Sequence, residues 1–230
     1  MIVIVPTRER PLNAADLIEA WKMTGATARL FFAVDETDPQ MPAYEKLLKD
    51  APGFVSWRRC PTTTMIEALN YAAVNYRGTH DVVGFMGDDH RPRTHRWDQH
   101  IREIFDRLGP RVVYGNDTIQ GPMLPTAVFL PGEFVARANK MCPGGLVHMY
   151  ADNYWKALGE RADLITYLPD LVIQHVHPIT GQVPWDEGYI RVNDGGLMAT
   201  DKVTFDEYTG SVNMSRDVAI LEELHAKWSA

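Results

Sequence analysis

The sequence predicts an α/β fold built on a mainly parallel sheet with helices on both sides. Short runs of β-branched and aromatic residues alternate with amphipathic stretches through residues 1–86, in the order of successive β-α units. The length of 230 residues suits one large domain or two small ones. The composition, 45% hydrophobic and 23% charged, is that of a globular protein and excludes collagen-like, disordered and disulfide-scaffold classes.

The first half supplies the most regular part of this pattern. Gly25 follows the first helix as a stop signal, and Asn13 is expected to cap its start. The fourth strand is apolar throughout, so we expect it to be buried on both faces. The expected strands are Met1–Val5, Leu30–Val34, Phe54–Trp57 and Val82–Met86, and the expected helices are Leu12–Met23, Pro42–Lys49 and one that begins after Thr62–Thr64.

The second half is less regular. Residues 1–178 are expected to form the core, and residues 179–230, where the pattern loosens, to be a C-terminal extension packed on it. The tryptophans at positions 21, 57, 97 and 228 are expected in the core. The expected strands are Val112–Tyr114, Thr126–Leu130 and Leu171–His177, and the expected helices are one ending at Met141, Asp152–Leu158 and Ser215–Trp228.

Charge and cysteine content narrow the class of protein. A net charge of −7 argues against a surface that coats nucleic acid, although a local basic patch stays open. Cys60 and Cys142 do not make a disulfide framework, so a reduced, cytoplasmic protein is expected. The N-terminal apolar run is too short for a signal peptide, and no stretch approaches 18 apolar residues, so no membrane span is expected.

Polar residues follow three of the predicted strands. Parallel sheets bind ligands outside the carboxyl ends of their strands, at the point where the strand order reverses. Thr7 and Arg8 follow the first strand, Asp35 ends the second, and Asp88 and Asp89 follow the fourth. Two adjacent carboxylates suit a divalent cation such as Mg²⁺ or Mn²⁺, which would neutralise a diphosphate. The alternative is a solvated Gly-Asp-Asp turn.

Two other motifs carry candidate chemistry. In His175-Val176-His177, alternation places both imidazoles on one face of a strand, which favours a metal role for at least one of them. We favour His177, which is nearer the strand end; the alternative is a half-buried histidine bonded to a backbone carbonyl. Asp152 begins a predicted helix beside aromatic residues, so it is a candidate general base or sugar ligand, although a plain N-cap explains the local sequence as well. Trp155 and Trp185 are candidates for a sugar-binding surface.

Several familiar motifs are absent from the sequence. It contains no G-x-x-x-x-G-K-[ST], no G-x-G-x-x-G after the first strand, no C-x-x-C and no G-x-S-x-G. These absences argue against P-loop nucleotidases, dinucleotide oxidoreductases, zinc ribbons and α/β-hydrolases.

Taken in order, the motifs resemble those of GT-A glycosyltransferases, most closely the family 2-like enzymes. The wording Gly-Asp-Asp-His, with the later Trp-Asp-Glu-Gly-Tyr at 185–189, is similar to small glycosyltransferase-like proteins of tailed bacteriophages of actinobacteria. The matching pieces are Val5-Pro6-Thr7-Arg8, Val34-Asp35, Thr64–Asn70, Phe85–His90, Ala151–Trp155 and Gln174–Pro178.

The resemblance implies a nucleotide site in the first half of the chain. The family's first loop falls on Pro6-Thr7-Arg8 and its second-strand acid on Asp35, and both hold the nucleotide. The segment around Thr64, Glu67 and Asn70 lines the same pocket.

The resemblance also implies a metal site and a base. The family's D-x-D motif falls on residues 87–89, so Asp89 matches the metal-binding acid. The first acid of that motif is Gly87 here, which leaves open whether Asp88 or His90 substitutes for it. Asp152 matches the general base of inverting members, and one of His175 and His177 matches the late metal-binding histidine.

The implied activity is transfer of a hexosyl or pentosyl group from a nucleoside-diphosphate sugar, with Mn²⁺ or Mg²⁺ as cofactor and inversion at the anomeric carbon. The acceptor stays open between a protein, a glycan and a modified DNA base, and a phage origin would place the protein in the host cytoplasm. Two alternatives remain. One is an inactive nucleotide- or sugar-binding module. The other is a metal-dependent phosphoester or nucleotide-sugar hydrolase, which would use Asp88, Asp89, His90, His175 and His177.

Overall fold

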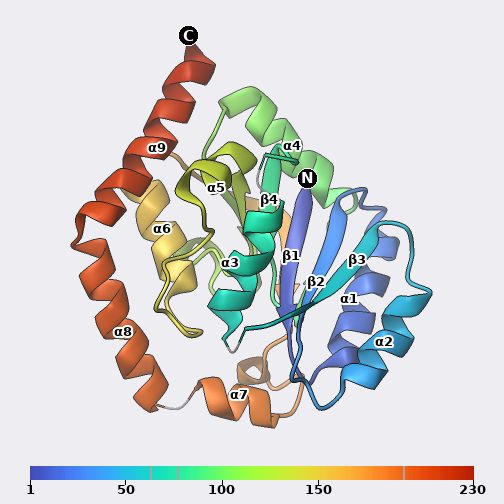
Figure 1. Cartoon of the computed structure of the whole chain (residues 1–230). Helices are drawn as coiled ribbons and strands as arrows, with labels where there is room; N and C mark the ends of the chain where they lie inside the picture. Colours follow the sequence, from blue (N-terminus) through green and yellow to red (C-terminus); the bar gives the residue numbers. More distant parts are fainter. Residues whose placement is uncertain (63, 77, 194) are drawn as a thin grey trace.

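Eight strands form one mixed sheet in the computed structural model, which describes residues 1–62, 64–76, 78–193 and 195–230 (Figure 1). The strand order is β3-β2-β1-β4-β7-β6-β8-β5. The chain therefore runs outward from β1 through β2 to β3 and then returns to add β4 on the other side of β1. This reversal between β1 and β4 is the place where open α/β sheets hold their ligands.

The first half has the predicted β-α alternation. Its strands pair in parallel, and β4 is buried along its whole length, as its apolar sequence predicts. Gly25 ends α1 in the left-handed conformation, with φ 65°. Asn13 does not cap that helix, because the helix already begins at Pro11 and Asn13 lies inside it. The elements are β1 (Ile2–Thr7), α1 (Pro11–Thr24), β2 (Arg29–Asp35), α2 (Met41–Lys49), β3 (Val55–Cys60), α3 (Met65–Asn75) and β4 (Val82–Phe85).

The second half completes the sheet with mixed pairing. β7 is antiparallel to both β4 and β6, and β5 is antiparallel to β8, so the sheet is parallel only in part. The helix expected to reach Met141 ends at Ala138, because Asn139 turns left-handed with φ 57°. The elements are β5 (His90–Pro92), α4 (Trp97–Leu108), β6 (Val112–Asn116), the 3-10 turn η1 (Gly121–Met123), β7 (Val128–Pro131), α5 (Gly132–Ala138), α6 (Ala151–Arg161) and β8 (Ile165–His175).

Two apolar cores lie on the two faces of the sheet. Alternation along each strand decides the face: Val3 and Val5 of β1 pack with α1, α2 and α4, whereas Ile2 and Ile4 pack with α3, α5, α6 and α9. Trp21 of α1 meets the indole of α4 edge-on, with ring centroids 4.8 Å apart. Both tryptophans are fully buried, which agrees with their predicted core positions.

The last part of the chain wraps the α6 side of the sheet (Figure 1). It forms a 3-10 turn η2 (Pro178–Thr180) and three helices, α7 (Glu187–Val192), α8 (Gly195–Thr209) and α9 (Val212–Ser229). Met214, Leu221 and Leu224 of α9 join the core that α5 and α6 build. Trp228 is 48% exposed, so its predicted place in the core is wrong. It lies near the end of α9, beyond the last buried residue of that helix.

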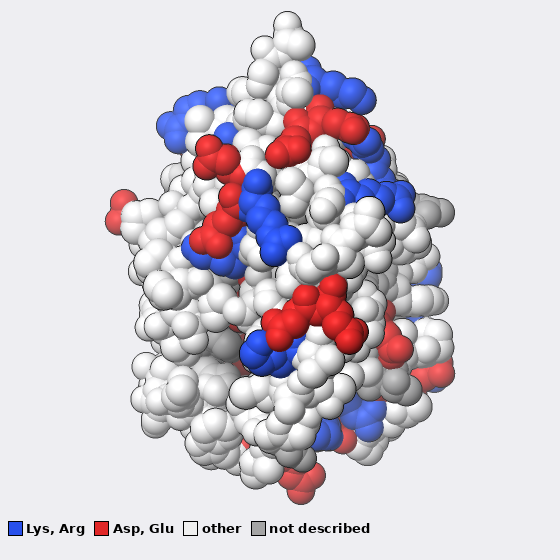
Figure 2. Space-filling model, turned by 90° about the vertical axis from the view of Figure 1, so that its left-hand side faces the viewer, with Lys and Arg blue, Asp and Glu red and all other residues white. Residues whose placement is uncertain are grey.

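The face formed by α8 and α9 carries charged side chains of both signs. Acidic and basic side chains are interspersed there (Figure 2). Among the described residues, no helix is long and apolar enough to cross a membrane. Cys60 and Cys142 are buried free thiols, and burial raises the pKa of Cys60 to about 11.

Candidate active site

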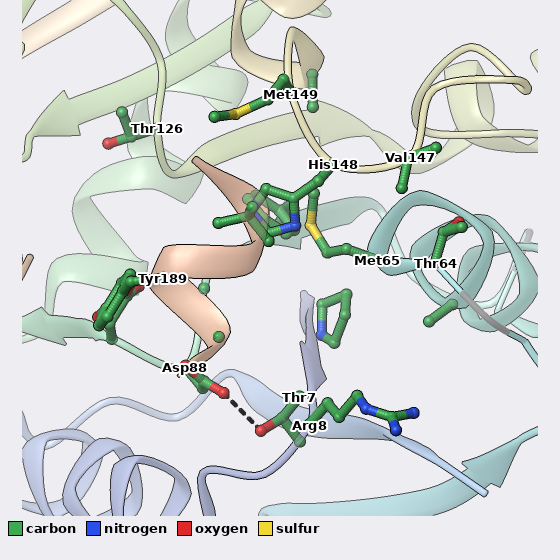
Figure 3. A pocket seen from close by; sticks show the side chains of 18 of the residues that line it. Thr7, Arg8, Thr64, Met65, Asp88, Thr126, Val147, His148, Met149 and Tyr189 are labelled. Atoms are coloured by element: carbon green, nitrogen blue, oxygen red, sulfur yellow. Dashed lines mark hydrogen bonds between the residues drawn. The ribbon is translucent and has the colours of Figure 1, made fainter. Parts of the chain in front are cut away.

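A cavity of about 440 Å³ opens at the carboxyl ends of β1 and β4, where the strand order reverses (Figure 3). Its walls come from the loops after these strands, the start of α3, the loop 147–150, the start of α6, the end of β8 and α7. The structure brings to this one cavity the sequence-predicted residues Pro6, Thr7, Arg8, Asp35, Thr64, Asp88, Asp89, Asp152, His175 and His177.

Asn70 does not belong to this cavity. Its side-chain oxygen accepts the backbone N–H groups of Met141 and Cys142 at 2.9 and 3.1 Å, and its amide donates to the Cys142 carbonyl. Asn70 therefore holds the loop after α5, and its predicted place in the nucleotide pocket is not supported. Glu67 is exposed and likewise lies outside the cavity lining.

Asp35 closes the end of β2 with a dense set of hydrogen bonds. One carboxylate oxygen accepts the backbone N–H and hydroxyl of Thr37 at 2.8 and 2.7 Å, and the other pairs with the Arg8 guanidinium. Burial raises the pKa of Asp35, but the bonds from Thr37 and Arg8 outweigh it and hold that pKa below its usual range. The pair therefore places a fixed anion and a fixed cation on one wall of the cavity.

Asp88 joins β1 to β4 across the switch point. The Thr7 hydroxyl donates to it at 2.6 Å, as Figure 3 shows, and the Arg10 guanidinium lies 3.6 Å away. Burial and the neighbouring charge of Asp89 raise the pKa of Asp88 to about 6. The Asp88 carboxylate is thus held by Thr7 and Arg10, which lie at and after the end of β1.

Asp89 lies between two imidazoles. Its Oδ1 is 3.3 Å from Nδ1 of His90, and its Oδ2 is 3.3 Å from Nε2 of His175. The two rings stack with centroids 4.4 Å apart, because β5 and β8 pair His90 directly with His175. Burial raises the pKa of Asp89, but the positive charge and hydrogen bond of His175 outweigh it and hold that pKa well below its usual range.

Of the two predicted histidines, His175 ends β8 and lies in this group, whereas His177 lies beyond the strand and outside the group, so the preference for His177 is not supported. The His177 ring meets the His175 ring edge-on at 5.2 Å, and its Nδ1 accepts the Ile179 N–H. Side chains of Asp89, His90 and His175 offer one ligand atom each within 4.8 Å of one another. One carboxylate and two imidazoles within that distance are a donor set that fits a divalent cation.

Asp152 lies in the first turn of α6 and lines the cavity. The N-cap position belongs to Tyr150, whose backbone is left-handed with φ 64°, so the N-cap alternative for Asp152 does not hold. One Asp152 oxygen accepts the Asn153 N–H at 2.9 Å. Burial raises the pKa of this carboxyl above its usual range. A carboxylate with few partners and a raised pKa suits proton transfer.

The last fifth of the chain adds residues that sequence inspection missed. The Tyr189 hydroxyl of α7 donates to Asp89 Oδ2 at 2.9 Å, and the guanidinium of Arg10 lies 3.7 Å above the Tyr189 ring. Arg10 also makes a two-pronged ion pair with Asp186, at 2.9 and 2.7 Å. The motif at 185–189 contains Tyr189, but no sequence pattern indicates its contact with Asp89, which lies 100 positions earlier.

The loop 147–149 forms another wall and is held from α8. Asp201, which is fully buried, accepts the backbone N–H groups of Val147, His148 and Met149 at 2.9, 2.9 and 2.7 Å. In Figure 3 the three side chains of this loop lie around the cavity, with Met65 below His148. Burial lowers the pKa of His148 to about 4, so its ring is neutral near pH 7.

The candidate sugar-binding tryptophans differ. Trp155 is fully buried and donates its indole N–H to the Met141 carbonyl at 2.7 Å, so it is part of the wall's support. Trp185 is 51% exposed and meets the His177 ring edge-on at 5.7 Å, outside the cavity lining.

Comparison with known proteins rests on solved structures. No family model matches the sequence, and no curated protein matches it. A mannosyltransferase from Pyrobaculum calidifontis, solved with GDP-Man and Mn²⁺, superposes with a TM-score of 0.60 at 10% identity over 99% of this chain and 82% of that one. A TarS fragment from S. aureus, solved with UDP, gives 0.59 at 12% identity over 90% and 71%. The chain has the GT-A fold.

This chain is shorter than the TarS chains that it matches. This chain spans 58% of another structure of the TarS fragment, at a TM-score of 0.57, and 43% of a longer TarS structure, at 0.58. At 13% identity these matches show the shared fold alone. The α/β architecture with helices on both faces is therefore confirmed, and the chemistry has to be argued from the site.

Proposed function

We propose that this protein is a metal-dependent glycosyltransferase that moves a hexosyl or pentosyl group from a nucleoside-diphosphate sugar to an acceptor hydroxyl. One observation carries the proposal: a carboxylate–imidazole group and a separate carboxylate with a raised pKa line the same cavity at the switch point of a GT-A sheet. Structural neighbours were solved with GDP-Man and Mn²⁺ and with UDP-GlcNAc, which supports a donor of this class.

The donor nucleotide is assigned to the β1–β2 wall. Asp35 and Arg8 present an acceptor and a donor of hydrogen bonds there, and Pro6 and Thr64 line the same side of the cavity. Thr7 and Asp88 close its floor. Asp89 and His175 would hold Mn²⁺ or Mg²⁺ next to the diphosphate. When bound, the ion would neutralise negative charge on the departing nucleoside diphosphate.

Asp152 is assigned as the general base. In its ionised form it accepts the proton of the acceptor hydroxyl while that oxygen forms a bond to the anomeric carbon. The bond from that carbon to the diphosphate oxygen breaks, and the electron pair leaves with the nucleotide. Attack from the side opposite the diphosphate inverts the anomeric configuration. The acceptor stays a prediction, which leaves a protein, a glycan and a modified DNA base open. The phage origin and the cytoplasmic location also stay predictions.

Calorimetric titration with UDP, GDP, TDP, CDP and ADP, each with and without Mn²⁺, tests the donor assignment. We expect one nucleotide to bind in a Mn²⁺-dependent way and Asp89→Asn to lose that dependence. Asp206→Asn, at an exposed acid that pairs with Lys202 on α8, is the matched control and should bind as wild type. Failure of all five nucleotides to bind with Mn²⁺ present would contradict the proposal.

Asp152→Asn separates transfer from binding. The amide cannot accept the acceptor proton, so we expect sugar transfer to fall by about a hundredfold or more while nucleotide binding stays as in wild type. Unchanged transfer would remove Asp152 from the mechanism. Binding without any turnover in wild type would favour the inactive-module alternative.

The hydrolase alternative receives less support. Within the described residues, Asp89, His90 and His175 are the single group of three metal-ligating side chains whose ligand atoms lie within 4.8 Å of one another. Asp88 is turned to Thr7 and Arg10 instead, so a second metal would lack carboxylate ligands there.

A further inference from the structure

Trp185 borders the cavity from outside. It lies in the segment between η2 and α7, with about half of its surface exposed. Its indole meets the His177 ring with centroids 5.7 Å apart and the Tyr189 ring with centroids 6.2 Å apart, nearly at right angles in both cases. His177 and Tyr189 line the cavity, whereas Trp185 does not. A ligand that fills the cavity and extends past these two rings therefore meets the indole.

The backbone beside Trp185 is held in place by its neighbour. The Asp186 carboxylate accepts the Tyr189 N–H at 2.8 Å and so caps the start of α7. The same carboxylate receives both prongs of the Arg10 guanidinium, which ties this segment to the loop after β1. An indole carried on a fixed backbone loses little conformational freedom when a ligand binds, so its exposed surface is preorganised for contact.

The charges around the indole argue against an acceptor that is rich in phosphate. Residues 178–190 contain no Lys or Arg, and Asp186 and Glu187 follow Trp185 directly. Nucleic acids take much of their affinity from Lys and Arg side chains that contact phosphates. This edge of the cavity lacks such side chains and carries two acids instead, so an uncharged ligand fits it better.

The polar and aromatic groups at this edge suit a sugar ring. The C–H face of a pyranose is apolar and weakly positive, so it packs on the electron-rich face of an indole. His177 supplies a hydrogen-bonding group next to the indole. Its Nδ1 accepts the Ile179 N–H at 3.2 Å, which leaves Nε2 of the neutral ring as a donor to a hydroxyl group.

We propose that Trp185 and His177 form an acceptor subsite that binds the second sugar ring of an uncharged glycan. The first ring lies in the cavity, which Asp152 also lines, and presents the hydroxyl that is glycosylated. This inference rests on the proposed function for the reaction. It selects the glycan among the three classes of acceptor, and it requires a glycan of at least two sugar units.

Binding to an array of immobilised glycans tests the subsite. The array carries neutral monosaccharides and oligosaccharides, heparin as a polyanionic glycan, and a single-stranded DNA oligomer. It is probed with Mn²⁺ and the five nucleoside diphosphates present and again without them, and calorimetry with the free glycan gives the affinity of each ligand that is retained. We expect wild type to bind at least one neutral oligosaccharide about tenfold or more tightly than its terminal monosaccharide.

Substitutions of Trp185 locate the binding. Trp185→Ala should weaken glycan binding by about tenfold or more, whereas Trp185→Phe, which keeps an aromatic face, should stay within about threefold of wild type. Trp185→Gln decides the question if the alanine variant does not fold. Nucleotide binding should stay as in wild type in all three variants, because Trp185 lies outside the cavity lining.

Trp228→Ala is the matched control. This tryptophan is exposed to a similar extent, 48%, and also lies beside an imidazole, that of His225. It is near the end of α9, at the opposite end of the molecule from α7 (Figure 1). Its loss should change glycan affinity by less than about twofold.

The outcomes separate this inference from the proposed function. Equal glycan affinity in folded Trp185→Ala and wild type, retention of heparin or DNA alone, or no retained glycan would overturn the subsite. If glycan binding depends on Trp185 but no nucleotide binds, the subsite stands and the transferase proposal falls. If a nucleotide binds with Mn²⁺ but no neutral glycan does, the transferase proposal stands and this inference falls.

Discussion

Gly87 shows how one missing side chain shapes the candidate site. Its backbone N–H holds the His90 ring, and its lack of a Cβ admits both that ring and the Asp89 carboxylate. The sequence shows the glycine but not its neighbours, so the contacts of Asp89 and His90 around it could be seen only in the folded chain.

Gly87→Ala is expected to disrupt this arrangement. The added methyl group would collide with Asp89 and His90, so Mn²⁺ affinity should fall by about tenfold or more. The free energy of unfolding, measured by urea denaturation, should fall by about 1–3 kcal/mol. Gly144→Ala is the control, because a Cβ there meets no atom within 4 Å. Normal Mn²⁺ binding by the Gly87 variant would contradict the packing argument.

Asp152 makes a pH prediction at the same scale. A general base works in its ionised form, which exists above its pKa, and burial raises the pKa of Asp152. Activity should therefore fall as pH decreases through that raised pKa, at a higher pH than an exposed aspartate with a pKa of about 3.9 would cause. A pH profile of kcat/KM measures this limb. An acid limb at or below pH ~4 would count against Asp152 as the base.

Residues with local sequence signals were the predictable part of the site. Asp35 and Asp89 lie at the carboxyl ends of strands, and Asp152 lies in the first turn of a helix. These positions could be recognised in the sequence, and the three residues line one cavity. Asp117 contacts His175 and Tyr189 contacts Asp89, and no local pattern connects either residue to such a distant partner. Their roles could be seen only once the chain was folded.

At the level of elements, apolar periodicity decided what could be predicted. The strands of the first half and α1 to α3 carry clear apolar patterns and lie close to their expected bounds. The helix α4 was missed, although Trp97, Ile101 and Ile104 are spaced for one helix face and are buried. In α8 the buried residue is Asp201, and Phe205 and Tyr208 pack against the core while only partly buried, so the helix has no fully buried apolar stripe to detect.

Asp201 links that helix to the cavity wall, which makes α8 testable as an element. Asp201→Ala leaves three backbone N–H groups of the loop 147–149 without their acceptor. We expect the free energy of unfolding to fall by about 2–4 kcal/mol and donor binding to weaken, because the loop lines the cavity. Asp206→Ala, an exposed acid on the same helix, should change neither quantity. Normal donor binding in the Asp201 variant would show that the loop holds its position without α8.

At the scale of the whole molecule, the predicted core (residues 1–178) and C-terminal extension (residues 179–230) share one apolar core. Leu221 and Leu224 of α9 complete the apolar core that α5 and α6 form. Asp217 of α9 accepts hydrogen bonds from the hydroxyl groups of Tyr154 and Tyr208. The extension thus contributes side chains both to the apolar core and to the candidate active site. The sequence predicted that the extension packs on the core, but not that it reaches the candidate site.

A chain that stops at residue 178 is expected not to form the native state. Removal of α9 uncovers the apolar faces of α5 and α6, and removal of α7 and α8 takes away Tyr189 and Asp201. The shortened chain should bind a hydrophobic dye, lose its near-ultraviolet circular dichroism and lose Mn²⁺ binding. A cooperative melting transition together with intact Mn²⁺ binding would contradict this expectation.

The ties between the two ends of the chain also set an order of events during synthesis. Arg10 pairs with Asp186, 176 positions later, and Asp89 receives its bond from Tyr189 only after a further 100 residues have been made. Contacts this distant in sequence form slowly, and a growing chain adopts its early segments first. On the ribosome all eight strands of the sheet are made before α7 emerges. The contacts of α7 with the candidate site therefore form only after the strands of the sheet have been made.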